Sequence, residues 1–218
     1  MKIKYFIGGY DKNLCYLIWC EISKKAAIID PSVEISPIIN YINKEKLILE
    51  RVFITHTHED HIRYLKDFMI EYHSKLKVHI SNKTQYDGKL NTKYFVFNNQ
   101  VITLGYENIT CLETPGHYYD SICFWSPGNK VVFTGDTMFI GRTGRVISKR
   151  SNIQNLYNSI YNVLLELPKD TIIYSGHNYG KKLFDSISNN ISSSSFFSCK
   201  NLKEFIHVMN EYEKNRKN

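Results

Sequence analysis

The segment Thr55-His56-Thr57-His58-Glu59-Asp60-His61-Ile62 carries most of the chemical information in this chain. Its three imidazoles and the carboxylate of Asp60 stand close enough together to form half of a metal site. An apolar run over 47–54 precedes the segment and predicts a buried strand, and apolar residues at helical spacing follow over 62–72. We therefore expect the histidines on a turn between a strand and a helix. In an open α/β sheet such a turn faces the crevice where ligands bind.

The bulk properties of the chain favour an ordinary globular protein. With 218 residues, 43% of them hydrophobic, it is long enough for one domain with a substantial core. No apolar run approaches the ~18 residues that a membrane span needs, and Met1 to Phe6 already follow a strand pattern, so we expect neither a membrane partner nor a signal peptide. The five cysteines form no Cys-x-x-Cys pair, which predicts free thiols and a cytoplasmic location.

The chain is basic, with a net charge of +7 and a pI near 9.0. Such an excess can indicate a nucleic-acid surface. Here the basic residues are scattered and no recognised nucleic-acid module accompanies them, so we favour a solvated lysine-rich coat and expect no nucleic-acid partner. The positive charge could still attract an anionic small substrate.

Strand and helix signals fall into two similar halves. Strand patterns up to residue 30 are followed by a helix over 35–43 and by the histidine segment. The second half has strands at 121–125 and 130–134, a helix over 151–167 with Ser151 as its N-cap, and a strand at 171–174. Two sheets packed face to face with helices outside are expected from this order.

Two parts of the chain are expected. Residues 1–184 form the main domain. Residues 185–218 comprise a Ser/Asn-rich loop over 185–201 and a last helix from Leu202 to about Tyr212, packed on the same domain.

Three further ligand-type residues follow strand signals. His117 comes after the strand ending near Leu112, Asp136 after the strand at 131–133, and His177 after the strand at 172–174. Together with the first segment they supply five histidines and two carboxylates, enough for two adjacent cations that share one carboxylate. Imidazole and carboxylate suit zinc, iron or manganese.

The His-x-His-x-Asp-His run followed by Gly-His, Gly-Asp and Gly-His resembles the metallo-β-lactamase superfamily, and the likeness extends over nearly the whole chain. The resemblance implies a four-layer αββα sandwich of two mixed sheets flanked by helices, and two divalent metal ions. Zinc is the first expectation for both, and iron or manganese are the alternatives. The implied site residues are His56, His58 and His117 for the first ion, Asp60, His61 and His177 for the second, Asp136 as the bridge, and Asp30 behind the ligands.

Within the superfamily, two branches are excluded by residues of this chain. Diiron flavoproteins carry Glu where His58 stands. Nucleases with an inserted domain need far more than the 41 positions between Asp136 and His177. Two glutathione-handling branches remain, hydroxyacylglutathione hydrolase (glyoxalase II) and persulfide dioxygenase.

Three residues are expected to contact the substrate. Arg145, nine positions after Asp136, matches a basic residue that holds a glutathione carboxylate in the hydrolases, and an arginine can do so bidentately. Tyr179 matches a tyrosine that contacts glutathione. Tyr118 opens the segment Tyr118-Tyr119-Asp120, which replaces the usual Thr-x-Gly and is expected to change one wall of the pocket. Only 41 residues follow His177, too few for the full glutathione-binding domain of the longer hydrolases.

The resemblance implies a thioester hydrolase in which a hydroxide held between two metals attacks the thioester carbonyl, oriented by Asp60. The substrate would be a small-molecule thiol ester, glutathione-derived or carried on another thiol. The alternative is an oxygenase with one iron, held by His56 or His58 together with His117 and Asp136, acting on glutathione persulfide. A metal-holding domain without activity is the third possibility. The sequence leaves the oligomeric state open.

Overall fold

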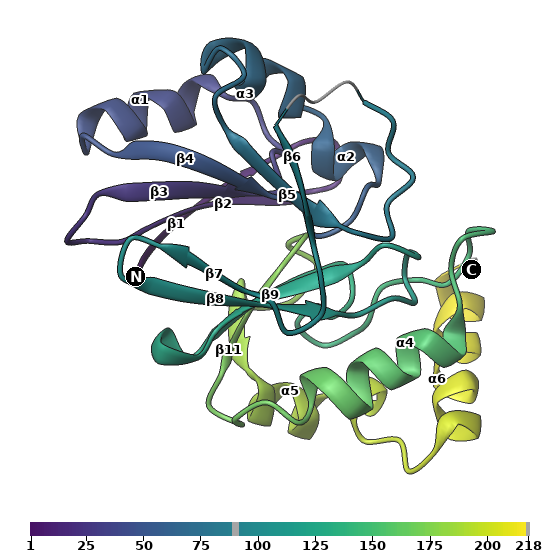
Figure 1. The fold of residues 1–218 in the computed structure, drawn as a ribbon. Coiled ribbons are helices and arrows are strands. Elements are labelled where there is room, and N and C mark those ends of the chain that lie inside the picture. Colours follow the sequence, from purple (N-terminus) through teal and green to yellow (C-terminus); the bar gives the residue numbers. More distant parts are fainter. Residues whose placement is uncertain (89–91, 217–218) are drawn as a thin grey trace.

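The computed structural model describes residues 1–88 and 92–216, and these residues form two mixed six-stranded β-sheets that face each other (Figure 1). The strands of the first sheet are, in spatial order, β1 (Lys2–Gly8), β2 (Asn13–Trp19), β3 (Lys25–Ile29), β4 (Ile48–Phe53), β5 (Lys77–Ser81) and β6 (Lys93–Val96). Those of the second are β12 (Phe184–Ser186), β11 (Ile172–Ser175), β10 (Val131–Gly135), β9 (Ile122–Ser126), β8 (Glu107–Glu113) and β7 (Val101–Leu104).

Helices cover the outer face of each sheet, which confirms the expected αββα sandwich (Figure 1). Those on the first sheet are α1 (Ser36–Lys44), α2 (Glu59–Ile62) and α3 (Leu65–Glu71). Those on the second are α4 (Ile153–Ser159), α5 (Ile187–Ser193) and α6 (Leu202–Arg216). In the described part of the chain, no helix is both long and apolar enough to cross a membrane.

Strand β2 shows how the layers are held together, because it is buried on both faces. Leu14, Tyr16 and Ile18 point into the core between the sheets. The alternate residues Cys15 and Leu17 pack in the outer core with α1 and α3. Apolar residues on both sides of a strand are expected where both faces of the sheet are covered.

The candidate ligands meet at one edge of the sandwich because of strand direction. Strand β4 is parallel to β3, and β10 is parallel to β11. Strand β8 is antiparallel to β9, which is antiparallel to β10, so β8, β10 and β11 all end at the same edge. The backbone bond from Ile122 N to Thr55 O, 2.8 Å, ties the histidine segment of the first sheet to the second sheet.

Two expected helices differ in detail from the structure. The helix over 62–72 is broken near Tyr64, whose backbone N–H bonds Pro31 O at 2.9 Å, and the result is the two short helices α2 and α3. The helix over 151–167 becomes α4 followed by a π-helical turn, Ile160–Leu164. Ser151 is not its N-cap, because the side chain of Asn152 accepts the bond from Asn155 N.

Residues 185–201 are not the loop that their Ser and Asn content predicts. They contain the end of β12, helix α5 and a 3₁₀ turn, Ser195–Phe197. Ser186 caps α5 by accepting from Asn189 N. The fully buried Asn190 donates to Phe139 O and accepts from Gly141 N, so the polar residues here serve as caps and tertiary bonds.

The last helix packs on the second sheet together with α4. Phe205 is fully buried and Met209 nearly so, in the same apolar cluster as Leu156 and Ile160. Lys217 and Asn218, the end of the expected second part, lie outside the described residues.

Candidate metal centre

The seven residues singled out as ligands converge at this edge in two groups. In the first, Nε2 of His56 and Nε2 of His117 lie 2.9 and 3.0 Å from Nδ1 of His58. In the second, Nε2 of His177 lies 3.2 Å from Nε2 of His61 and 3.3 Å from Asp60. The donor atoms in each group lie within 4.8 Å of one another, close enough to share one metal ion.

Asp136, directly after β10, lies between the two groups. Its Oδ1 is 3.2 Å from Nε2 of His61, and its Oδ2 is 3.6 Å from Nε2 of His117 and 3.4 Å from that of His177. This carboxylate is therefore in contact with both groups, as a bridging ligand must be.

The outward nitrogens of four of these histidines face acceptor atoms. Nδ1 of His117 lies 2.9 Å from Arg145 O, and Nδ1 of His177 lies 2.9 Å from Asp11 O. Nδ1 of His56 lies 3.1 Å from Oγ1 of Thr55, and Nδ1 of His61 lies 2.8 Å from Asp30. Such partners fix the tautomer that keeps a lone pair on Nε2 for a metal.

Asp30 holds the histidine segment from behind. Its two carboxylate oxygens accept from the backbone N of Thr55 at 2.7 Å and from Oγ1 of the same residue at 2.6 Å. The residue is buried and adopts a positive φ of 50°. The contact with His61 makes Asp30 part of the support for the second group.

The electrostatics differ between the two groups. Burial lowers the pKa of His56 well below its usual value and that of His58 to about 4, with further lowering from neighbouring imidazoles. Burial would also lower the pKa of His61 and His177, but neighbouring carboxylates together outweigh it. Asp136 and Asp30 raise the pKa of His61 well above its usual value, and Asp136 and Asp60 raise that of His177 to about 9. The imidazoles of the second group therefore lie among carboxylates, whereas those of the first group lie mainly among other imidazoles.

Asn13, at the start of β2, is a site residue that the sequence reasoning missed. Its Nδ2 donates to Asp60 at 2.8 Å. Burial would raise the pKa of Asp60, but the bonds from His177 and Asn13 and the charge of His61 lower it well below its usual value. The only signal in the sequence is one polar residue in an otherwise apolar strand.

The surroundings fit a metal ion. Oδ1 of Asp136 is buried and has no hydrogen-bond partner among the described residues, although it lies beside His61. A Cβ on Gly176 would come within 2.4 Å of that oxygen and 2.6 Å of Cε1 of His61. Glycine is therefore required before His177, because any side chain would crowd the two ligands.

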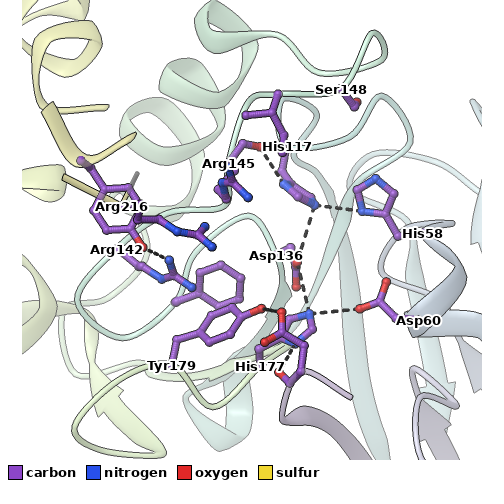
Figure 2. Close-up of a pocket in the computed structure, with 14 residues that line it drawn as sticks. His58, Asp60, His117, Asp136, Arg142, Arg145, Ser148, His177, Tyr179 and Arg216 are labelled. Atoms are coloured by element: carbon purple, nitrogen blue, oxygen red, sulfur yellow. Dashed lines mark hydrogen bonds and ion pairs between the residues drawn. The ribbon is translucent and has the colours of Figure 1, made fainter. Parts of the chain in front are cut away.

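A cavity of about 680 Å³ opens beside the cluster. His58 and Asp60 lie on one side of it, and Arg142, Arg145 and Arg216 gather on the opposite side (Figure 2). The cavity thus combines a candidate metal centre with a cationic wall.

The chain matches a known family over most of its length: the model of the metallo-β-lactamase superfamily matches residues 8–177. The chain belongs to this superfamily. Members of the superfamily bind divalent metals, in agreement with the histidine-rich centre.

Three relatives illustrate where the chain lies in the metallo-β-lactamase superfamily. A probable hydroxyacylglutathione hydrolase, glo2 of Schizosaccharomyces pombe, is 32% identical over 94% of this chain and 77% of its own length. A probable polyketide biosynthesis zinc-dependent hydrolase, PksB of Bacillus subtilis, is 26% identical over 89% of this chain and 85% of its own. The crystal structure of ETHE1 from Myxococcus xanthus superposes with a TM-score of 0.86 at 28% identity, covering 97% of this chain and 91% of that one.

The three residues expected to contact the substrate lie in different settings in this metallo-β-lactamase fold. Arg145 and Tyr179 line the cavity, and the Tyr179 hydroxyl donates to Asp11. Tyr118 is not among the described residues that line it. Its ring lies against His58, with centroids 4.1 Å apart.

Three residues of the cavity wall were not predicted from the sequence: Arg142, Tyr212 and Arg216. Arg142 stacks 4.0 Å from the centroid of the Tyr179 ring and donates to the hydroxyl of Tyr212. Tyr212 and Arg216 come from α6, which was expected only as a packing helix. No local pattern marks them, because they reach the site through the packing of α6 on the second sheet.

Proposed function

We propose that this protein is a metal-dependent thioester hydrolase of the glyoxalase II type, acting on a small thiol ester derived from glutathione. The observation that carries the proposal is the opening of the seven-residue cluster into a cavity with three arginines on its far wall. Carboxylates of a glutathione moiety suit such a wall, because guanidinium groups bind carboxylates with paired hydrogen bonds. The similarity to glo2 supports the same assignment.

We propose His56, His58 and His117 as ligands of a first metal ion, and Asp60, His61 and His177 as ligands of a second, with Asp136 shared. Zinc is the first choice, since the donors are nitrogen and oxygen atoms and a relative is named as zinc-dependent. When bound, the ions supply a water molecule that is deprotonated at neutral pH and a positive charge that polarises the carbonyl oxygen.

The chain's own groups orient the reaction. Asp60, held by Asn13 and kept ionised, accepts a hydrogen bond from the attacking water and directs its lone pair. The bonds behind His61 and His117 keep the rings from turning. A thiol has a pKa near ~8.5, so the leaving thiolate needs no strong acid from the protein.

We also propose a cytoplasmic location and no nucleic-acid partner. All five cysteines are buried and unpaired, as is usual for proteins of a reducing compartment.

One observation favours a second candidate, oxidation of glutathione persulfide by a single iron. The similarity to ETHE1, a persulfide dioxygenase, extends over nearly both chains. In this alternative the iron would be held by His56 or His58 with His117 and Asp136. Imidazole and carboxylate bind zinc and iron alike, so the donor atoms fit both activities.

The two candidates separate in one experiment on the purified protein. Its zinc, iron and manganese are measured, and cleavage of S-lactoylglutathione is assayed beside oxygen uptake with glutathione persulfide. The hydrolase proposal requires thioester cleavage that is abolished in His56→Ala. One iron per chain with oxygen uptake and no cleavage would overturn it in favour of the oxygenase. Fully metallated protein without either activity would favour a metal-holding domain.

A further inference from the structure

The arginine expected to grip the substrate is already held by a carboxylate of the protein itself. Nε and Nη2 of Arg145 donate to the two carboxylate oxygens of Glu213, each at 2.7 Å. We propose that Glu213 competes with the carboxylate of the substrate for Arg145. Glu213 would thereby determine how strongly the site prefers thiol carriers that have a carboxylate over those that have none. The inference rests on the proposed thioester hydrolase and adds a residue that determines its substrate.

The contact between Arg145 and Glu213 has the geometry that a substrate carboxylate would adopt on this arginine. A guanidinium offers its Nε and one Nη as a planar fork, and a single carboxylate fills that fork. With Glu213 in place, an incoming carboxylate finds only the remaining N–H groups of Arg145. The substrate must therefore displace Glu213 or bind Arg145 less well.

The two partners differ in how firmly they are anchored. The backbone oxygen of Arg145 lies 2.9 Å from Nδ1 of His117, so this segment is fixed to the metal centre. Glu213 lies on the last turns of α6, beyond the buried anchors Phe205 and Met209. The glutamate side chain is 22% exposed and that of the arginine 33%, so solvent reaches the pair and can take up the displaced carboxylate.

Arg142, the neighbouring arginine of the wall, is held differently. It stacks on Tyr179 and donates to Tyr212, so it keeps its position by aromatic packing. Figure 2 shows Arg142 and Arg145 on the same side of the cavity. A carboxylate that reaches this wall thus meets one guanidinium that is stacked on an aromatic ring and one that Glu213 already occupies.

The competition by Glu213 should weaken the binding of a carboxylate ligand by a modest but measurable factor. If the arginine is free of Glu213 in only part of the molecules, the apparent affinity for a carboxylate ligand falls by that fraction. A partly exposed ion pair of this kind corresponds to a factor of about five. A thioester without a carboxylate does not compete with Glu213 for Arg145, so its apparent affinity should not be lowered.

The test is the binding of S-hexylglutathione, a thioether that cannot be hydrolysed, to the metal-loaded protein by calorimetry. Glu213→Gln and Glu213→Ala should each bind it about fivefold more tightly than the wild type. Glu211→Gln is the matched control, because Glu211 is on the same helix and pairs with Lys214 at the surface. In an Arg145→Ala background, Glu213→Gln should change nothing.

Equal or weaker binding by both Glu213 variants would overturn the inference and leave Glu213 as a structural anchor of α6. Absence of binding in every variant would overturn it as well. The readout does not depend on turnover, so failure to cleave S-lactoylglutathione would defeat the proposed hydrolase while this binding result still stands. If cleavage occurs, Glu213→Gln should lower KM for S-lactoylglutathione and leave KM for S-lactoyl-N-acetylcysteamine, which has no carboxylate, unchanged.

Discussion

Asp120 accepts a hydrogen bond from Oγ1 of Thr57 at 2.6 Å, and a longer one from the backbone N of the same residue at 3.3 Å. Thr57 stands between His56 and His58, so this bond fixes the histidine segment to the loop that follows His117. Asp120 is only 1% exposed. The substitution of the usual Thr-x-Gly by Tyr118-Tyr119-Asp120 therefore adds a buried support for the metal centre.

Asp120→Ala is expected to destabilise the protein by about 2 kcal/mol, because it leaves the two donors of Thr57 without this acceptor in a partly buried place. Urea unfolding at a fixed zinc concentration measures the change. The control Asp170→Ala removes an exposed ion pair with Lys130 and should cost less than about 1 kcal/mol. Equal losses in the two variants would contradict a supporting role for Asp120.

His177→Ala should reduce the metal content from two ions per chain to about one, because only the second group loses a donor while His56, His58 and His117 stay in place. Elemental analysis after dialysis against trace zinc provides the count. The exposed His207 supplies the control, and His207→Ala should retain both ions. Two ions in His177→Ala would refute the assignment of this residue.

Removal of metal should lower the thermal midpoint by about 5–10 °C. Binding at about 100 times the dissociation constant adds about 2.7 kcal/mol to the free energy of unfolding, and a chain of this size responds with about 2–4 °C per kcal/mol. Differential scanning calorimetry with and without a chelator tests this. A midpoint that the chelator does not move, in protein shown to have lost its metal, would mean that the centre contributes nothing to stability.

His79 should make the protein sensitive to acid. It is buried in β5, stacks on Phe53 and accepts a hydrogen bond at Nε2 from Arg51 at 3.0 Å. Burial, with Arg51 adding to it, lowers the pKa of His79 to about 3. In the unfolded chain the pKa of this histidine is ~6.5. Neutral His79 therefore contributes fully to the free energy of unfolding above that pH, and this contribution is lost as the pH falls toward 3.

The loss should approach about 1.4 kcal/mol per pH unit for this one proton. His79→Gln keeps an acceptor for Arg51 and cannot titrate. The free energy of unfolding of this variant should therefore fall less steeply than that of the wild type over the roughly two units from pH 6 to pH 4. His207→Gln serves as the exposed control. Parallel pH profiles for wild type and His79→Gln would rule out His79 as the acid-sensitive group.

Tyr179 should act through its ring and not through its hydroxyl. The ring stacks on His177 with an interplanar angle of 7° and carries Arg142 at 4.0 Å, while the hydroxyl donates to Asp11. Tyr179→Phe should therefore change KM for S-lactoylglutathione less than about twofold, whereas Tyr179→Ala should raise it about tenfold, or about 1.4 kcal/mol, by releasing Arg142. A rise in Tyr179→Phe as large as that in Tyr179→Ala would instead indicate a bond from the hydroxyl to the substrate.

The sequence could predict the strand–turn positions of the seven candidate ligands because each follows the end of an apolar strand within eight residues. Strand direction then brings the ends of β4, β8, β10 and β11 to one edge, so local spacing was sufficient for His117, Asp136 and His177. Composition was a poor guide over 185–201. There Ser186 and Asn190 act as a cap and as a buried tertiary partner, which composition cannot distinguish from loop residues.

By itself, the sequence determined which side chains are candidate metal ligands, since imidazoles and carboxylates at strand ends are readable from short stretches of chain. Only the tertiary structure decided what these groups face. Asn13 reaches Asp60 across 47 residues of chain, and Arg145 reaches Glu213 across 68. Such contacts depend on the packing of whole elements, here β2, next to the edge of the first sheet, and α6 on the second. For that reason the candidate metal centre could be inferred from the segment at Thr55, whereas the arginine-lined wall of the cavity could not.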